Sequence, residues 1–309
     1  MIADAIATCP CCSSIDSTFK GRLPNVEWFA GVRLHQALDG GGLFECTQCH
    51  LLFRFPLQPP ETYAKLYNQP SVAIWSGTVR RRDWELIETR LLRNETGARQ
   101  ILDYGCHTGG LLRHLAFIQE RYGVEINASA AEFAALNSKA VIFPSLSAIP
   151  NDLRFDAITA CDVIEHVENP RELVSQLLSL LKPTGSLILT TGDANASLWK
   201  KSGANWWYCF YPEHIAFISR DWLNYYEKNG DFIVVECTNF RQGSLSFLRR
   251  KWEHLLIHAY RTLPDFLLAA ARLARKLRGK GPPASVPGNG ATADHLFAVL
   301  TRAKGTVPS

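Results

Sequence analysis

The sequence predicts an α/β protein with a doubly wound, mostly parallel sheet at its centre. Three observations predict it: short apolar segments alternate with helical segments of about ten residues from residue 98 onward, turn residues separate the two, and a glycine-rich loop follows the first strand. Strands that alternate with helices in this way are joined by parallel crossover connections. With 309 residues, the chain is long enough for one such domain and smaller attachments.

The elements of this domain follow one another in regular order. Strands are expected at 98–105, 121–126, 140–143, 155–161, 185–191, 231–237 and 295–303, and helices at 109–120, 129–138, 169–181 and 219–230. A capping box of Ser129 and Glu132, and the caps Asn169 and Ser219, mark three helix starts. We therefore place the domain at 61–240, opened by helical pieces between 61 and 94 and closed by the strand at 295–303.

Residues 1–60 carry two cysteine pairs that predict a small zinc-binding module. Cys9 and Cys12 form one C-x-x-C knuckle, Cys46 and Cys49 form the other, and 33 residues separate Cys12 from Cys46. Two such knuckles supply the four thiolates of a closed, structural Zn²⁺ site, which makes the module similar to a zinc ribbon. The alternative is a set of reduced, buried cysteines. Nine cysteines and no visible signal peptide favour a reducing, cytoplasmic setting.

The basic character of the chain is concentrated in one segment. The net charge is +4, but residues 241–280 contain ten Lys or Arg and only two Asp or Glu. Two amphipathic helices are expected within 245–278, followed by a flexible Gly/Pro-rich linker that ends at 294, so we interpret 241–294 as an insertion before the last strand. The helices could pack on the core or on a second subunit in a homodimer, lie on anionic lipid at the inner face of a membrane, or bind RNA. We favour these three readings in that order.

The loop after the first strand predicts the kind of cofactor. Gly105 and Gly109 allow a ligand to approach the backbone, and His107 belongs to a residue type that tolerates positive φ better than most. Asp103 would repel the phosphates of a dinucleotide but would favour a cationic ligand without phosphate. Glu125, at the end of the second strand, is suited to ribose hydroxyls. S-adenosylmethionine, with its sulfonium and amino groups, fits these residues.

Five ordered blocks extend this reading to a family. They are ILDYGCHTGGLL, GVEIN, FDAITACDVIEHVENP, LLKPTGSLILTTG and PEHIAFISRDWLNYYEKNGDF. In order and spacing they resemble the class I S-adenosylmethionine-dependent methyltransferases. The resemblance implies a seven-stranded, Rossmann-like sheet whose last strand is antiparallel.

The same resemblance implies which residues hold the cofactor. Asp103, Gly105 and Gly109 would line its methionine end and Glu125 its ribose, with Cys161 and Asp162 beside it after the fourth strand. Cys106, His107 and Ile126 complete the expected set of cofactor-binding residues. Two departures stand out: His107 replaces a usual glycine, and FPSLS at 143–147 lacks the acid that often contacts the adenine amino group.

The layout of cysteine pairs followed by this domain resembles a bacterial group with an N-terminal zinc-binding module, which includes sugar C-methyltransferases and enzymes of surface-glycan clusters. Tyr211-Pro212-Glu213-His214 resembles the Y-x-E-H element of the sugar enzymes. By that resemblance His214 is the catalytic base, Glu213 orients it or binds substrate, and Tyr211 and His166 are pocket groups.

The expected function is therefore methylation of a small-molecule or glycan acceptor, either free or lipid-linked, on oxygen or carbon. Two alternatives stay open. An RNA methyltransferase would use the zinc module and the basic helices to bind RNA, although the chain lacks an N-P-P-Y-like or paired-cysteine catalytic signature, so a nucleic-acid partner is disfavoured. A catalytically inactive cofactor-binding protein would account for His107 and the missing adenine acid.

Overall fold

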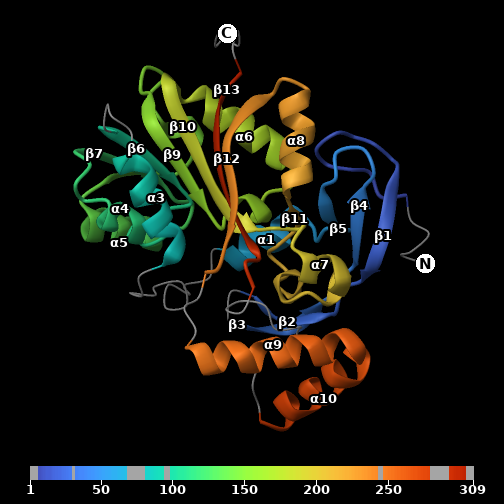
Figure 1. The fold of residues 1–309 in the computed structure, drawn as a ribbon. Helices are drawn as coiled ribbons and strands as arrows, with labels where there is room; N and C mark the ends of the chain where they lie inside the picture. Colours follow the sequence, from blue (N-terminus) through green and yellow to red (C-terminus); the bar gives the residue numbers. More distant parts are fainter. Residues whose placement is uncertain are drawn as a thin grey trace.

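The computed structural model describes residues 6–29, 32–67, 81–93, 98–242, 246–278 and 292–303. A central seven-stranded sheet has helices on both faces, a smaller sheet lies at one side, and a helical hairpin lies below both (Figure 1). The hairpin consists of α9 (Phe247–Thr262) and α10 (Pro264–Leu277). No helix within the described ranges is long and apolar enough to cross a membrane.

The large sheet has the strand order β12-β13-β10-β9-β6-β7-β8. Neighbours from β10 to β8 are parallel, whereas β13 is antiparallel to both β10 and β12. This confirms the doubly wound fold with an antiparallel last strand. The strands are β6 (Gln100–Tyr104), β7 (Glu120–Val124), β8 (Val141–Phe143), β9 (Phe155–Cys161), β10 (Leu181–Gly192), β12 (Phe232–Phe240) and β13 (His295–Arg302).

Each face of the sheet is covered by its own helices. One face packs against α3 (Arg82–Leu92), α4 (Gly110–His114) and α5 (Ala128–Ser138), and the other against α6 (Pro170–Ser179) and α8 (Arg220–Lys228). Successive residues of a strand serve opposite faces. In β10, the Ile188 side chain packs on the face covered by α3, α4 and α5, whereas the Leu187 and Leu189 side chains pack on the face covered by α6 and α8.

Two of the three expected helix starts are confirmed, and one is wrong. Asn169 Oδ1 accepts a hydrogen bond from Glu172 N at 3.2 Å, and Ser219 Oγ accepts one from Trp222 N at 3.2 Å. The capping box at Ser129 does not form, because Asn127 begins α5 two residues earlier and caps it through Ala130 N at 3.0 Å. The helix expected at 109–120 is also too long, since the chain turns after His114 to reach β7.

The N-terminal sheet takes one of its strands from the segment that we placed in the 61–240 domain. Its order is β1-β4-β5-β11, formed by β1 (Ser17–Arg22), β4 (Gly42–Cys46), β5 (Leu52–Phe55) and β11 (Ala216–Phe217). A separate hairpin pairs β2 (Val26–Phe29) with β3 (Val32–Leu38). The division into 1–60, 61–240 and 241–294 stays a prediction, because residues 216–217 complete the first of these units.

The segments outside the sheets differ in part from expectation. The helical pieces at 61–94 include α1 (Pro60–Tyr67) and α3, while 68–80 lie outside the described residues. Residues 279–291 of the expected linker also lie outside them. Asp294, which we placed in that linker, is buried and accepts a hydrogen bond from Trp207 Nε1 at 3.1 Å. The remaining short helices are η2 (Leu146–Ala148), η3 (Ile164–His166), α7 (Ser197–Ser202), η4 (Gly203–Asn205) and η5 (Trp207–Phe210).

Candidate cofactor and acceptor site

The loop between β6 and α4 forms a tight turn with three residues at positive φ. Gly105 and Gly109 both have φ of 73°, and His107 has φ of 45°. His107 therefore occupies the left-handed region that we expected it to tolerate. A Cβ on Gly105 would lie 2.5 Å from Val163 Cγ2, so both the backbone conformation and the available space require glycine there.

Asp103, the second-last residue of β6, is a buried carboxylate. It is 4% exposed, and Thr159 Oγ1 in β9 donates a hydrogen bond to its Oδ1 at 2.7 Å. Burial raises the pKa of Asp103 to about 7, although the bond from Thr159 acts in the opposite direction. The protonated and the ionised forms of Asp103 are therefore similar in free energy near neutral pH, and a nearby cation would favour the ionised form.

Glu125 lies beyond the end of β7, which is the parallel neighbour of β6. Its Oε2 accepts a hydrogen bond from His107 N at 3.0 Å, and its Oε1 accepts one from Asn127 N at 2.8 Å. Burial raises the pKa of Glu125, while these backbone bonds lower it. The carboxylate thus links the loop to the start of α5, and the exposed Ile126 side chain follows it.

The expected cofactor residues gather at the carboxyl edge of the sheet. The tips of β6, β7 and β9 are adjacent there and carry Asp103, Gly105, Cys106, His107, Gly109, Glu125, Ile126, Cys161 and Asp162. Cys106 is buried, and a Cβ on Gly123 would lie 2.6 Å from its Sγ. Cys106 thus packs against β7 inside the turn.

Arg81, just before α3, joins this edge and was missed in the sequence. Its guanidinium pairs with Asp83 (Nε to Oδ1, 3.0 Å) and also with Asp162 Oδ2. Burial alone would lower the pKa of Arg81, but the carboxylates of Asp162 and Asp83 raise it overall. Asp83 is fully buried, which fixes the direction of the arginine side chain. Arg81 was missed because three consecutive arginines before a helix resemble an ordinary solvated surface.

A second group, which we call the acceptor cluster, consists of Glu165, His166, Tyr208, Tyr211 and His214. The rings of His166 and His214 are 4.9 Å apart between centroids, and those of Tyr211 and His214 are 5.1 Å apart. Potential ligand atoms of Glu165, His166 and His214 lie within 4.8 Å of one another, so these three side chains could hold a metal ion. The structure thus brings the predicted residues His166, Tyr211 and His214 together.

His214 is a buried, neutral histidine. Its Nδ1 lies 2.8 Å from the carbonyl oxygen of Tyr208, which can only accept, so Nδ1 carries the proton and Nε2 carries the lone pair. Burial lowers the pKa of His214 well below its ordinary value, and the His166 ring adds to the effect. Burial also lowers the pKa of His166, against the influence of Glu213. Glu213 itself is 2% exposed.

Glu165 and Tyr208 also belong to this cluster, although the sequence analysis did not select them. Tyr208 Oη donates to Glu165 Oε1, and Thr191 Oγ1 donates to Glu165 Oε2 at 2.9 Å. Burial raises the pKa of Glu165 to about 8, with the charge of Asp162 acting in the same direction. Nothing in the spacing of IEHV and WWYCFY, which carry Glu165 and Tyr208, signals this carboxyl–phenol pair in the sequence.

Arg54 connects the small sheet to the loop that carries His214. The Arg54 side chain projects from β5 and is buried. Its Nε donates a hydrogen bond to His214 O at 3.3 Å, and its Nη2 donates to Cys209 O at 3.0 Å and to Tyr211 O at 3.1 Å. Nη1 donates to Gly40 O at 2.5 Å. Burial lowers the pKa of Arg54. The main chain of the acceptor cluster is therefore held from the N-terminal part of the protein.

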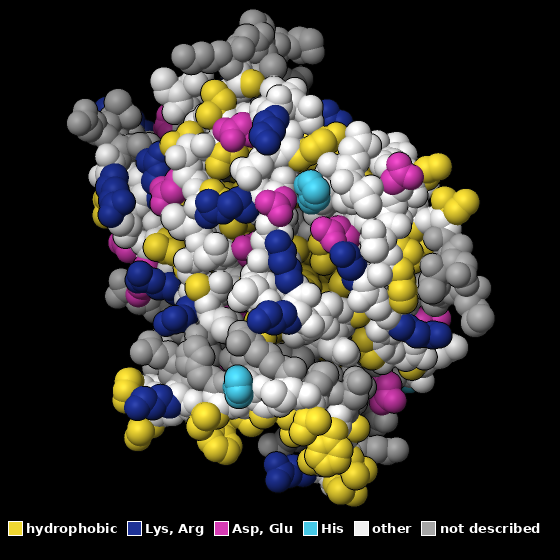
Figure 2. Space-filling view, turned by 45° about the vertical axis from the view of Figure 1, so that its right-hand side comes forward, with side chains coloured by type: hydrophobic (Ala, Val, Ile, Leu, Met, Phe, Trp, Pro, Cys, Tyr) yellow, Lys and Arg dark blue, Asp and Glu magenta, His cyan; other side chains and the backbone are white. Residues whose placement is uncertain are grey.

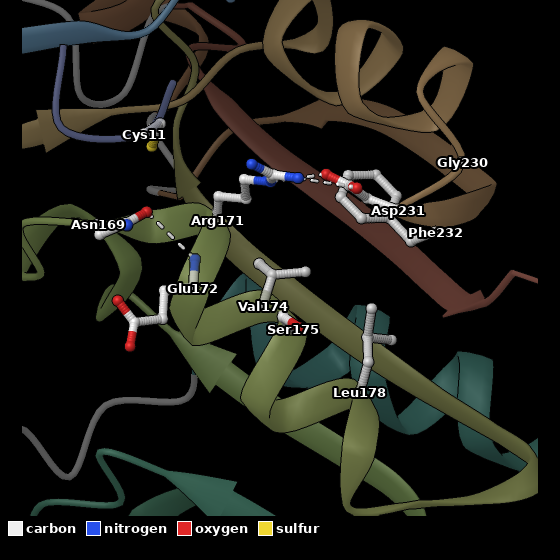
Figure 3. Close-up of a pocket in the computed structure, with 10 residues that line it drawn as sticks. All are labelled: Cys11, Asn169, Arg171, Glu172, Val174, Ser175, Leu178, Gly230, Asp231 and Phe232. Carbon is white, nitrogen blue, oxygen red and sulfur yellow. Dashed lines mark hydrogen bonds and ion pairs between the residues drawn. The ribbon is translucent and has the colours of Figure 1, made fainter. Parts of the chain in front are cut away.

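The four predicted zinc ligands come together at one end of the small sheet. The Sγ atoms of Cys9, Cys12, Cys46 and Cys49 all lie within 4.8 Å of one another, and Cys9–Cys49 and Cys12–Cys46 are 3.5 Å apart. Cys11 lies outside this group and instead lines a groove of about 420 Å³ against α6 and β12 (Figure 3). That groove, with the Arg171–Asp231 ion pair at one end, contains none of the predicted site residues.

Comparison with known proteins agrees with this arrangement. Residues 78–236, just over half of the chain, match a family described as "Methyltransferase domain". A mitochondrial ubiquinone biosynthesis O-methyltransferase of Schizosaccharomyces pombe is 32% identical over 109 residues, which cover 32% of this chain and 40% of that protein. The ubiquinone biosynthesis O-methyltransferase of Rickettsia bellii (strain OSU 85-389) is 31% identical over 106 residues, covering 32% and 44%. The chain thus spans less than half the length of these relatives.

Among solved structures, the N-methyltransferase NodS from Bradyrhizobium japonicum, in complex with S-adenosylhomocysteine, has a TM-score of 0.46 at 13% identity, covering 78% of this chain and 97% of that one. The plantazolicin methyltransferase BpumL, in complex with a monoazolic desmethylPZN analogue and S-adenosylhomocysteine, has a TM-score of 0.45 at 18% identity, covering 72% of this chain and 82% of that one. The family match over half of the sequence, on a seven-stranded sheet with an antiparallel last strand, shows that this chain belongs to the class I S-adenosylmethionine-dependent methyltransferases.

Proposed function

We propose that this protein transfers the methyl group of S-adenosylmethionine to an oxygen nucleophile of a small-molecule acceptor. The observation that carries the proposal is the placement of His214, whose Nδ1 is fixed by the Tyr208 carbonyl oxygen so that Nε2 carries the lone pair, within a cluster of polar side chains. A hydroxyl acceptor must lose its proton when it attacks the methyl carbon, and a neutral imidazole can take that proton. The names of the curated relatives, which are O-methyltransferases, also favour oxygen as the acceptor atom.

The residues at the carboxyl edge of the sheet fit this cofactor. Asp103 and Glu125 provide negative charge for a cationic ligand, and Gly105 and Gly109 allow close approach to the backbone. Arg81, now paired with two carboxylates, is suited to bind the carboxylate of the methionine part. Once bound, the cofactor supplies a methyl carbon activated by its sulfonium group. Cys106, His107, Ile126, Cys161 and Asp162 complete the proposed cofactor site.

The acceptor cluster would orient and deprotonate the acceptor. We assign His214 as the base and Tyr211 and His166 as groups that line the acceptor pocket. Glu213 would orient the histidine pair, since its charge acts on His166. With its pKa raised to about 8, Glu165 would be largely protonated at neutral pH, and with Tyr208 it would form a hydrogen-bonded wall behind the base. A glycan or lipid-linked acceptor, and methylation on carbon, are finer versions of this proposal that rest on the Tyr211-Pro212-Glu213-His214 element.

We also propose that Cys9, Cys12, Cys46 and Cys49 hold a structural Zn²⁺. Four thiolates at about 2.3 Å from one tetrahedral ion would lie roughly 3.8 Å apart, close to the separations of the two nearest sulfur pairs. The ion would join the two C-x-x-C turns that flank β1 and β4 and would stabilise the sheet from which Arg54 projects.

The decisive experiment separates cofactor binding from methyl transfer. Calorimetric titration with S-adenosylmethionine should give one saturable site, which Glu125→Ala weakens strongly. Methyl-labelled cofactor should then label a hydroxylated small-molecule fraction of cell extract, and His214→Asn should abolish labelling while it leaves the cofactor affinity within about twofold. Absence of saturable binding would refute the cofactor assignment. Binding without labelling of any fraction would favour the catalytically inactive alternative, and label that enters RNA would replace the acceptor class.

A further inference from the structure

The helical hairpin α9–α10 exposes many large apolar side chains. Eight large hydrophobic side chains on it are 60–80% exposed, out of eighteen exposed ones in the described part of the chain. They are Phe247, Leu248, Trp252 and Leu255 from α9, Leu263 between the helices, and Phe266, Leu273 and Leu277 from α10. We call these eight residues the apolar hairpin face. Figure 2 shows hydrophobic side chains gathered along the lower edge of the molecule, where the hairpin lies.

The exposed face is not the side by which the hairpin is attached. Leu267 of α10 is half-buried and packs against the buried cluster that contains Trp199 and Trp206. In α10 the exposed residues Phe266, Leu273 and Leu277 are spaced by seven and four, so they share one side of the helix, and Leu267 lies off that side. The expectation that the apolar faces pack on the core is therefore wrong for these side chains, and the hairpin keeps a separate side for the body of the protein.

Positive charge accompanies this apolar surface. Residues 247–278 contain eight Lys or Arg and two Asp or Glu, and both Arg249 and Lys251 are exposed. The ammonium of Lys251 lies 4.6 Å from the centre of the Phe247 ring, so a charge sits directly beside the apolar face. Long basic side chains can bury their stems in an apolar phase while their charges reach anionic headgroups.

From these observations we infer that the apolar hairpin face docks this methyltransferase onto the surface of an anionic lipid bilayer, with α9 and α10 in the interfacial plane. The combination of apolar side chains and net positive charge complements such a surface. A second copy of the chain would bring a hairpin of the same positive charge against this one, so a symmetric dimer through this face is opposed electrostatically. RNA would be drawn by the charge but would leave eight exposed apolar side chains unused.

Vesicle sedimentation with the full chain tests the inference. Vesicles of phosphatidylcholine and phosphatidylglycerol should bind the protein at about 0.1 M salt, binding should weaken at about 0.5 M salt, and phosphatidylcholine alone should bind it poorly. Leu248→Asp combined with Leu273→Asp, one change on each helix, should lower partitioning by at least about tenfold. Leu136→Asp on α5 replaces a similarly exposed leucine, 77% against 78% for Leu248, and should change partitioning by less than about twofold.

Three results would overturn the inference. The first is failure of the wild-type protein to bind anionic vesicles. The second is a concentration-dependent dimer in light scattering that the double variant abolishes. The third is a pair of findings: the protein binds an RNA of about 30 nucleotides, and the wild type and the double variant partition equally onto vesicles. Cofactor affinity, measured on the same samples, reports folding and tests the proposed cofactor site independently of membrane docking.

Discussion

The guanidinium of Arg54 donates a hydrogen bond from Nε to the main-chain oxygen of His214, 160 positions further along the sequence. The same side chain also donates to Cys209 O and Tyr211 O, so it binds the loop that carries the proposed base at three carbonyl groups. A neighbouring strand pair, Ala216 with Phe53, continues this connection. The small N-terminal sheet therefore supports the loop that carries the proposed acceptor cluster.

Replacement of Arg54 should affect turnover more than cofactor binding. Arg54→Lys keeps the charge but cannot supply the same fork of donors. We expect a fall in kcat of about 10- to 100-fold and a loss of about 1–3 kcal/mol in unfolding free energy, with cofactor affinity unchanged. Arg22→Lys, at an exposed arginine of the same sheet, is the control. Equal losses of kcat and cofactor affinity would argue against a positioning role.

Replacement of Arg81 should weaken the binding of ligands that carry the methionine carboxylate more than that of ligands that lack it. If it binds the methionine carboxylate, Arg81→Gln should raise the Kd of S-adenosylhomocysteine by about tenfold or more. The Kd of 5′-methylthioadenosine, which lacks that carboxylate, should change by less than about threefold. Competitive titration of both ligands on the two proteins measures the difference. A similar loss for both ligands would show that Arg81 instead supports the fold of the site through Asp83 and Asp162.

Glu165 makes the stability of the protein depend on pH. The pKa of Glu165 is raised to about 8 in the folded protein, from about 4 in the unfolded chain. The stability that this group contributes is therefore complete below about pH 4 and is lost as the pH rises through about 8. Glu165→Gln mimics the protonated form and should not show this loss. The Tm of the variant relative to wild type should therefore increase between pH 5 and pH 9. A pH-independent difference in Tm would contradict the assigned protonation state.

Gly105 and Gly230 provide a matched pair of substitutions. Both have φ near +80°, at 73° and 80°, but a Cβ on Gly105 would meet Val163 whereas one on Gly230 would meet nothing within 4 Å. Gly230→Ala should cost about 1 kcal/mol of unfolding free energy from backbone strain alone. Gly105→Ala should cost about 1–3 kcal/mol more and weaken cofactor binding. Chemical denaturation of both variants measures the two decreases in unfolding free energy. Equal decreases would mean that the loop at Gly105 has room for a side chain.

Zinc content should follow the cysteine that is replaced. Metal analysis of the purified protein should give one Zn²⁺ per chain, and Cys46→Ser should lose it together with several degrees in Tm. Cys11→Ser is the control, because Cys11 lies next to a ligand in sequence but outside the four-sulfur group. Retention of zinc in Cys46→Ser would rule out the proposed ligand set.

Patterns in the sequence were sufficient to predict the order of the helices and strands and the presence of the glycine-rich loop. Periodicity and turn residues predicted all seven strands of the large sheet, and the tolerance of His107 for positive φ followed from its residue type. Helix limits were less reliable, as at Ser129, because Asn127 offered an equally good cap two positions earlier. Here a local hydrogen bond, from Asn127 N to the Glu125 carboxylate two residues earlier, accompanies the cap that forms.

The contacts that connect distant parts of the chain left no pattern in the sequence. Arg54 stands in LLFRFP as one polar residue in a short strand, and its partners are main-chain oxygens, which every residue type possesses. Asp83 and Arg81 read as part of a charged helix start, although Asp83 is fully buried. Such residues become recognisable only when burial and long-range partners are known.

The pairing of β5 with β11 has a consequence for the way the protein is made. The strand at Leu52–Phe55 leaves the ribosome long before Ala216–Phe217, the strand that completes its sheet. At roughly 5–20 residues per second, synthesis of the intervening stretch takes on the order of ten to thirty seconds. During that interval the Arg54 guanidinium lacks its carbonyl partners at Cys209, Tyr211 and His214, and the nascent edge of β5 stays open to water and to chaperones.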